Sequence, residues 1–210
     1  MKKYFILLNV LIILTMYSYA QRIELTPFAG YQLGGKRGYV QGDFKIINNV
    51  NFGGNLGVIF PRSSGVEFSY SYMPTKGEWR PDYLYERELP FSSFDLGVHY
   101  FQLAFIKELP LGIIRPYGLF SVGGTLFDFK NKTIDNGLSF SAAAGGGIKI
   151  MFSRLVGIRI QGRILLPFYT TGFGLYAGTG GVGLTTSSNV SIVQGDFTGG
   201  LVFAFGSNKK

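Results

Sequence analysis

Residues 156–167 constrain the fold of this chain more than any other stretch. Their sequence, VGIRIQGRILLP, alternates between aliphatic side chains and a second set that includes Arg159, Gln161 and Arg163. A period of two is that of a β-strand whose two faces meet different surroundings. A helix would place both arginines on the same stripe as Ile160, so the helical interpretation fails. About ten residues is also the length of a tilted strand that crosses a bilayer.

The same alternation recurs along the chain. It is clear at residues 23–33, 50–60, 66–72, 94–100, 138–150 and 194–205. In the segment 94–100 the pattern predicts Phe94, Leu96, Val98 and Tyr100 on the outer face and Asp95 and His99 on the inner face. An eighth strand, 115–127, is ambiguous, because Tyr117 and Leu119 compete with Phe120 and Val122 for the apolar face. We count it because the strands on either side of it need a partner.

The connections between these strands alternate in length. Long polar or glycine-rich segments, at 35–49, 74–91, 127–137 and 168–190, alternate with short ones at 61–64, 107–113 and 153–155. Outer-membrane barrels have long extracellular loops, short periplasmic turns and an even number of strands. The sequence therefore predicts an all-β protein, a closed up-and-down antiparallel transmembrane β-barrel of eight strands. Whether 168–190 is a loop or a protruding extension of the strands is left open.

The first twenty residues have the layout of a secretory signal peptide. Lys2 and Lys3 precede an apolar run at 4–16, and the small residue Ala20 then marks the expected cleavage site. The run is shorter than the ~20 residues that an uncleaved membrane helix needs. We expect residues 1–20 to be the signal peptide and 21–210 the barrel domain. Losing Lys2 and Lys3 lowers the net charge from +8 to +6. That charge is too small and too dispersed to indicate a nucleic-acid partner.

Alternation alone also fits a soluble ligand-carrying barrel, so the contents of the two faces must decide. Charged residues are only 15% of the chain, whereas a soluble domain averages about 25%. The polar face is mostly glycine, serine, asparagine and alanine, which suit the narrow interior of an eight-stranded barrel. The apolar face carries aromatic residues, which suit lipid contact. We expect aromatic side chains at both ends of the lipid-facing band. Those at one end are Tyr31, Tyr72, Phe94 and Phe140, and those at the other are Phe60, Phe152 and Phe203.

Charged residues on the inner face form a set of near-balanced sign. Its members are Glu24, Glu67, Asp95, Lys149, Arg159, Arg163 and Asp196. Buried charges persist only when paired. From parity and height above the turns we expect Arg163 to pair with Asp196, and Arg159 to reach Glu24 or Glu67. The set is either a polar core that holds the barrel together or a gate in a narrow conduction path, and the narrow bore favours the core.

Other candidate sites are weaker. His99 is the only histidine and there is no cysteine, so no metal set exists, and we expect no cofactor. Asp95 lies about 13 Å from His99 along a strand, too far for direct contact. The glycine runs at 145–147 and 178–183 lack the lysine and Ser/Thr of a phosphate loop. A possible loop recognition patch contains Trp79, Arg80, Tyr83 and Tyr85, although Trp79 also suits an interfacial anchor.

Three parts of the chain carry a resemblance that covers the whole of residues 21–210. They are the leader, the stretch RPYGLFSVGGTLF at 115–127 and the closing strand QGDFTGGLVFAFG at 194–206. The chain resembles the small outer-membrane barrels of the OmpA/OmpX type, and more narrowly the outer-membrane β-barrel domain proteins of Bacteroidetes. The resemblance implies the outer membrane of a Gram-negative bacterium, contact with its lipid and lipopolysaccharide, and insertion by the barrel-assembly machinery. The closing strand departs from the usual form because Phe205 is followed by further residues.

The resemblance leaves three functions open. A non-enzymatic barrel that acts structurally, or binds an unknown surface ligand through its extracellular loops, needs no further feature and is our first expectation. Small barrels also include enzymes that modify lipid A. The deacylase pattern has a serine two residues after its histidine, whereas Phe101 stands at that spacing from His99. A narrow channel is the third alternative.

Overall fold

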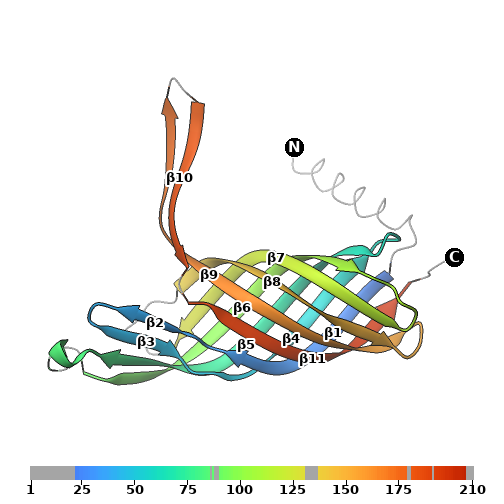
Figure 1. Ribbon diagram of the computed structural model, residues 1–210, viewed down its shortest axis with the longest axis horizontal. Coiled ribbons are helices and arrows are strands. Elements are labelled where there is room, and N and C mark those ends of the chain that lie inside the picture. Colours follow the sequence, from blue (N-terminus) through green and yellow to red (C-terminus); the bar gives the residue numbers. More distant parts are fainter. Residues whose placement is uncertain are drawn as a thin grey trace, which may run out of the picture.

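The computed structural model describes residues 22–85, 87, 90–130, 137–178, 181–190 and 192–206, with the backbone alone for 169–178 and 181–190. The predicted leader, 1–20, lies outside these residues. The strands are β1 (Arg22–Leu33), β2 (Lys36–Tyr39), β3 (Gly42–Ile46), β4 (Asn49–Ile59), β5 (Ser64–Pro81), β6 (Ser92–Glu108), β7 (Ile114–Phe129), β8 (Gly137–Met151), β9 (Val156–Gly178), β10 (Gly181–Val190) and β11 (Gln194–Phe205), and η1 (Tyr83–Tyr85) is a short 3-10 helix (Figure 1). No helix among the described residues is long and apolar enough to cross a membrane.

Eight of the strands close into a barrel. Each is antiparallel to its sequence neighbours in the order β1, β4, β5, β6, β7, β8, β9 and β11. The last strand returns to the first, with Ile23 opposite Phe205 and Leu33 opposite Gly195. The predicted eight-stranded up-and-down barrel is therefore confirmed, and the ambiguous strand is β7.

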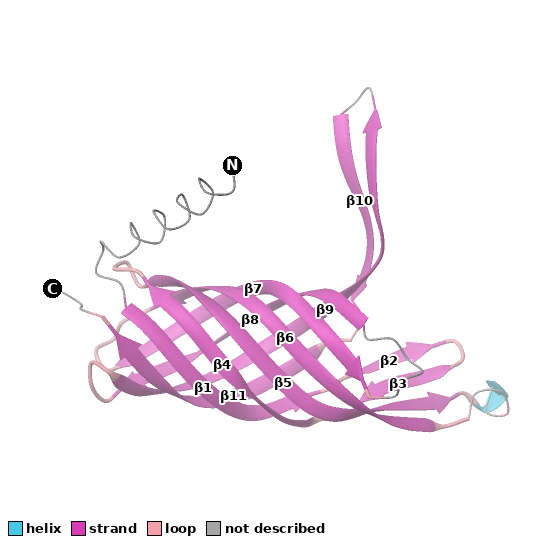
Figure 2. Cartoon of the chain, turned by 180° about the vertical axis from the view of Figure 1, so that it is seen from behind, coloured by secondary structure: helices cyan, strands magenta, loops and turns pink. Residues whose placement is uncertain are grey.

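The two ends of the barrel differ. At one end, here called the turn end, the connections are residues 60–63, 109–113 and 152–155. At the other, the loop end, β5 and β6 continue well past β1 and β4, and β3 pairs along β5 from Gly42–Pro81 to Ile46–Gly77. Both views show this sheet projecting from the barrel (Figures 1 and 2). Residues 36–39, 42–46 and 74–81, which were expected to lie in loops, are therefore strand.

The segment 168–190 is a protruding hairpin, which settles the alternative that the sequence leaves open. Beyond Phe168 the backbone of β9 pairs with β10, from Phe168–Val190 to Gly178–Gly181. This ribbon stands away from the barrel wall (Figure 1). Strands β8 and β11 stop pairing with β9 near the base of the hairpin, at Phe168 and Leu165 respectively.

In six strands, β1, β4, β5, β8, β9 and β11, the side chains point outward and inward as the alternation predicts. An apolar belt covers the outside of the barrel, and its exposed members include Leu25, Tyr31, Phe52, Leu56, Phe68, Phe101, Leu103, Phe105, Phe120, Phe140, Ile160, Ile164, Phe197, Leu201 and Phe205. The inner positions of the six strands are mostly small or polar, and Phe28, Leu165 and Val202 are among the apolar exceptions. In β7 the ambiguity is resolved with Phe120 and Val122 outside and Tyr117 and Leu119 inside.

The segment 94–100 faces opposite to the prediction. Leu96, Val98 and Tyr100 are fully buried inside the barrel, whereas Asp95 is exposed and His99 lies on the outer surface. The reason is that β6 rises beyond the apolar belt toward the loop end, where the outside is polar and the interior is an apolar cluster. Phe94 likewise packs against Phe44 and Phe129 instead of joining the outer ring of aromatic residues.

The glycines of β8 make room for larger side chains within the lumen. A Cβ on Gly147 would meet the hydroxyl of Tyr117 at 2.6 Å, and one on Gly145 would lie 3.0 Å from the Cγ of Arg163. Small residues at these two positions therefore let a phenol and a guanidinium cross a narrow bore.

Candidate functional site

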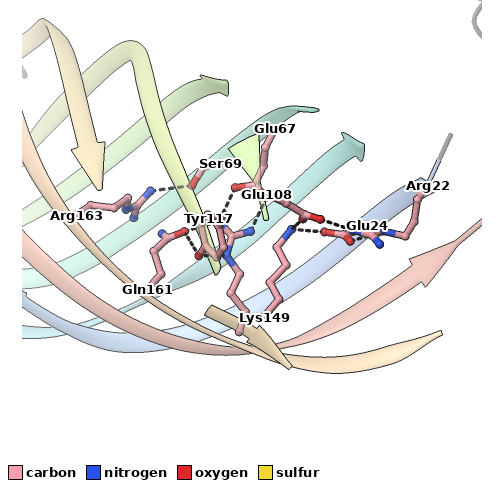
Figure 3. Close-up of polar contacts among 10 residues, drawn as sticks. Arg22, Glu24, Glu67, Ser69, Glu108, Tyr117, Lys149, Gln161 and Arg163 are labelled. Carbon is pink, nitrogen blue, oxygen red and sulfur yellow. Dashed lines mark hydrogen bonds and ion pairs between the residues drawn. The ribbon is translucent and has the colours of Figure 1, made fainter. Parts of the chain in front are cut away.

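The lumen next to the turn end holds a quartet of alternating charges. The Lys149 ammonium lies 2.5 Å from the Glu24 carboxylate and 2.6 Å from that of Glu108. Arg22 contacts the same two carboxylates, at 2.6 Å and 2.8 Å. Figure 3 shows the four side chains meeting from β1, β6 and β8. Each is buried, so each charge depends on the others for compensation.

A second layer lies deeper in the lumen and is built around Arg159. Its guanidinium makes a two-point contact with Glu67, at 2.5 Å and 2.9 Å. The Nε of Arg159 donates to the Tyr117 hydroxyl at 2.7 Å, and that hydroxyl donates to Gln161 at 2.9 Å (Figure 3). The guanidinium carbon also lies 4.7 Å from the centre of the Tyr117 ring. Of the two partners predicted for Arg159, Glu24 and Glu67, the structure shows the contact with Glu67.

The third layer contains the predicted pair of Arg163 and Asp196. The two residues are directly opposite in the register of β9 and β11, and their side chains meet at 3.1 Å and 2.5 Å. Arg163 also donates to the Ser69 hydroxyl at 3.1 Å, and the Asn51 amide donates to Asp196 at 3.3 Å. Two-point arginine–carboxylate contacts of this kind are among the stronger interactions available to a buried charge.

Apolar side chains fill the lumen toward the loop end. Above Arg163, Gln194 accepts hydrogen bonds from the Tyr100 hydroxyl at 2.6 Å and from Gln32 at 2.9 Å. A buried cluster then follows, formed by Ile46, Met73, Leu96, Val98, Tyr100, Phe127, Ala143, Leu165 and Ile192. The described lumen is thus occupied by charged pairs in one part and by an apolar core in the other.

Sequence reasoning missed two members of the charged set and included one residue that does not belong to it. Arg22 and Glu108 complete the quartet, whereas Asp95 is exposed outside the barrel for the reason given above. The missed signal was the continuation of alternation beyond Tyr100. Phe101, Leu103 and Phe105 lie outside while Gln102 and Glu108 lie inside, and Arg22 shares the parity of Glu24.

His99 lies on the outer surface between two tyrosines, and the prediction of an inward core histidine was wrong. Its Nδ1 is 3.0 Å from the Tyr70 hydroxyl, and its ring stacks on Tyr72 with centroids 4.5 Å apart. No described group of three or more histidine, aspartate or glutamate side chains is arranged to hold a metal.

The four residues of the expected recognition patch do not share one surface. Trp79 and Arg80 are neighbours in β5 and point to opposite faces of the projecting sheet. The Trp79 ring lies 6.0 Å from Tyr39, while Arg80 pairs with Glu78 at 2.9 Å. Tyr83 and Tyr85 belong to η1 at the tip of the sheet, where Tyr83 is exposed.

A closed eight-stranded antiparallel barrel is the fold of small outer-membrane β-barrel proteins. The chain is similar to the outer membrane protein OprG of Pseudomonas aeruginosa, with 14% identity, a TM-score of 0.59, and coverage of 90% of this chain and 97% of that one. It is also similar to Neisserial surface protein A, with 10% identity, a TM-score of 0.52, and coverage of 89% and 97%.

A major outer membrane protein from Thermus thermophilus gives 14% identity and a TM-score of 0.51, covering 87% of this chain and 99% of that one. No family model matches the chain, and no curated protein matches it either. The similarity therefore concerns the fold, and the narrower resemblance to the Bacteroidetes proteins stays a prediction.

Proposed function

We propose that this chain is a non-enzymatic outer-membrane β-barrel protein of a Gram-negative bacterium. In this proposal the lumen is a solid core that keeps the barrel closed, and the loop end binds a partner outside the cell. The observation that carries the proposal is the filled lumen. Four basic and four acidic side chains compensate one another there, below a buried apolar cluster.

The apolar belt supports location in a membrane. Large apolar side chains exposed on every side of a closed barrel are unfavourable in water and favourable in lipid. The predicted leader and the alternation of long and short connections favour the outer membrane, with the turn end in the periplasm. Insertion by the barrel-assembly machinery and contact with lipopolysaccharide are part of the same proposal.

A narrow channel is disfavoured by the contacts across the bore. An ion would have to separate Arg159 from Glu67 and Lys149 from two carboxylates, which leaves buried charges uncompensated. Conductance across a planar bilayer tests this. We expect the refolded full-length protein to give no steady current above the lipid baseline, with a reconstituted porin as positive control. A stable unitary conductance would overturn the proposal of a solid core.

The lipid A-modifying alternative requires a nucleophile activated by His99. The described hydrogen-bonding partner of His99 is the Tyr70 hydroxyl, and Phe101 occupies the position two residues further on. We expect lipid A from cells that express the wild-type protein or His99→Ala to have the same acyl chains by mass spectrometry. Loss or gain of one acyl chain with the wild type alone would favour the enzyme.

A further inference from the structure

Four basic side chains surround the turn end of the barrel. Arg62 lies in the connection from β4 to β5, Lys107 near the end of β6, Arg115 near the start of β7, and Arg154 in the connection from β8 to β9. Arg62, Lys107 and Arg154 are exposed, and Arg115 is half-buried. We call these four residues the basic rim.

The basic rim has no acidic partner among the described residues. Lys107 donates to the carbonyl of Arg62 at 2.8 Å and to the Ser64 hydroxyl at 3.0 Å, both uncharged acceptors. None of the four forms a salt bridge within the described part of the chain. The described carboxylates that are not in the lumen lie toward the loop end, and they are Asp43, Glu78, Asp82, Asp95 and Asp128.

The turn end is therefore the described part of the barrel at which the charges outside the lumen all have one sign. The lumen is neutral, because Arg22, Lys149, Arg159 and Arg163 are matched by Glu24, Glu67, Glu108 and Asp196. The loop end carries both signs, including the pairs Lys36–Asp43 and Arg80–Glu78. The described turn end carries positive charge alone, and a ring of one sign produces a field that attracts anions.

Aliphatic and aromatic side chains alternate with these cations. In the connection from β6 to β7, Leu109, Leu111 and Ile113 are 60%, 69% and 65% exposed. Phe152 and Leu155 flank Arg154 and are also exposed. Apolar groups beside cations match the boundary between acyl chains and phosphate headgroups, where long basic side chains keep their stems in lipid and their charges at the surface.

We propose that the basic rim binds the phosphate groups of anionic phospholipids in the leaflet that meets the turn end. The cations come from three separate turns spaced around the barrel, which suits a ring of lipids better than one compact protein contact. This inference rests on the proposed location in a membrane. Each basic side chain near an anionic surface contributes attraction that salt screens.

The test measures lipid selectivity of the full-length protein in bilayers. The protein is reconstituted in phosphatidylcholine, and electron spin resonance compares association of spin-labelled phosphatidylglycerol with that of spin-labelled phosphatidylcholine. We expect the wild type to select phosphatidylglycerol by ~3-fold or more at low salt, and less at high salt. The triple variant Arg62→Gln, Lys107→Gln and Arg154→Gln should lose most of this selectivity.

The matched control removes the same number of charges from the loop end, as Lys45→Gln, Lys76→Gln and Lys130→Gln, and should keep the wild-type selectivity. Equal loss in both variants, or retained selectivity in the turn-end variant, would overturn the inference. If the triple variant does not fold, the three single substitutions should each lower selectivity in part. Failure of the wild type to enter bilayers at all would instead contradict the proposed function.

Discussion

At the scale of single residues, the buried charges of the lumen are interdependent. Lys149 is fully buried and contacts two carboxylates that it shares with Arg22, and the Arg159 guanidinium donates to Glu67, Tyr117 and Gln161. Taking one charge away leaves its partner in a low-dielectric interior, which costs more than taking both. The pair of Arg163 and Asp196 is the simplest place to test this.

We predict that Arg163→Met destabilises the folded barrel by roughly 3–5 kcal/mol, because Asp196 loses its buried counter-charge. Adding Asp196→Leu should recover much of the loss, since the double variant buries no unpaired carboxylate. The folded fraction is measured by gel mobility across a urea series. A double variant whose loss equals the sum of the two single losses would show that the two side chains do not interact energetically.

A second residue-scale prediction concerns the glycines of the lumen wall. A methyl group on Gly147 would meet the Ile160 carbonyl at 2.1 Å and the Tyr117 hydroxyl at 2.6 Å, whereas one on Gly118 meets nothing within 4 Å. We expect Gly147→Ala to lower the free energy of unfolding by about 1–3 kcal/mol. Gly118→Ala, the control in the neighbouring strand, should leave it unchanged or slightly higher. Equal effects in the same urea series would contradict this account of Gly147.

At the scale of elements, the two hairpins of the loop end relate differently to the barrel. The backbone of β10 pairs with β9 alone, beyond the point where β8 and β11 end their pairing. In contrast, β3 pairs with β5 and places Ile46 in the apolar cluster with no exposed surface. The first hairpin is an appendage, and the second is part of the core.

We therefore predict that residues 169–189 can be replaced by Asn-Gly without loss of the barrel. Phe168 and Val190 are already cross-strand partners, and Asn-Gly forms a tight turn between such partners. The unfolding midpoint in urea should stay at the wild-type value. As the comparison within β3, Ile46→Ala should cost roughly 2–5 kcal/mol, because it leaves a cavity in a buried cluster. A barrel that no longer folds after the hairpin replacement would show that β10 is needed for closure.

At the scale of the whole molecule, closure of β1 on β11 leaves the barrel wall without a free edge. A wall with every strand paired resists detergent until heat opens it. We predict that the refolded protein migrates differently on SDS gels before and after boiling, and that cells place it in the outer-membrane fraction. Identical mobility in both samples, or full solubility without detergent, would contradict a closed membrane barrel.

Some features of the fold follow from the order of residues along one strand. In β9, for example, Ile160 and Ile164 lie outside while Arg159 and Arg163 lie inside, as the alternation predicts. In a strand between lipid and a polar lumen, successive side chains face the two environments in turn. The number of strands and the direction in which each side chain points can therefore be read from the local sequence. The same rule gave the wrong facing for Leu96 and Val98. There β6 extends beyond the apolar belt, so its outer side is polar and its inner side faces an apolar cluster.

By itself, the sequence determined that there are eight strands, that six of them place an apolar face outside and a mostly polar face inside, and that one end has short turns. It also determined that Arg163 and Asp196 meet, because both lie at similar heights on adjacent strands. Only the tertiary structure decided that Arg159 crosses to Glu67 and that Lys149 joins Glu24 to Glu108. Those contacts depend on the stagger of strands around the closed barrel, which no pattern within a single strand encodes.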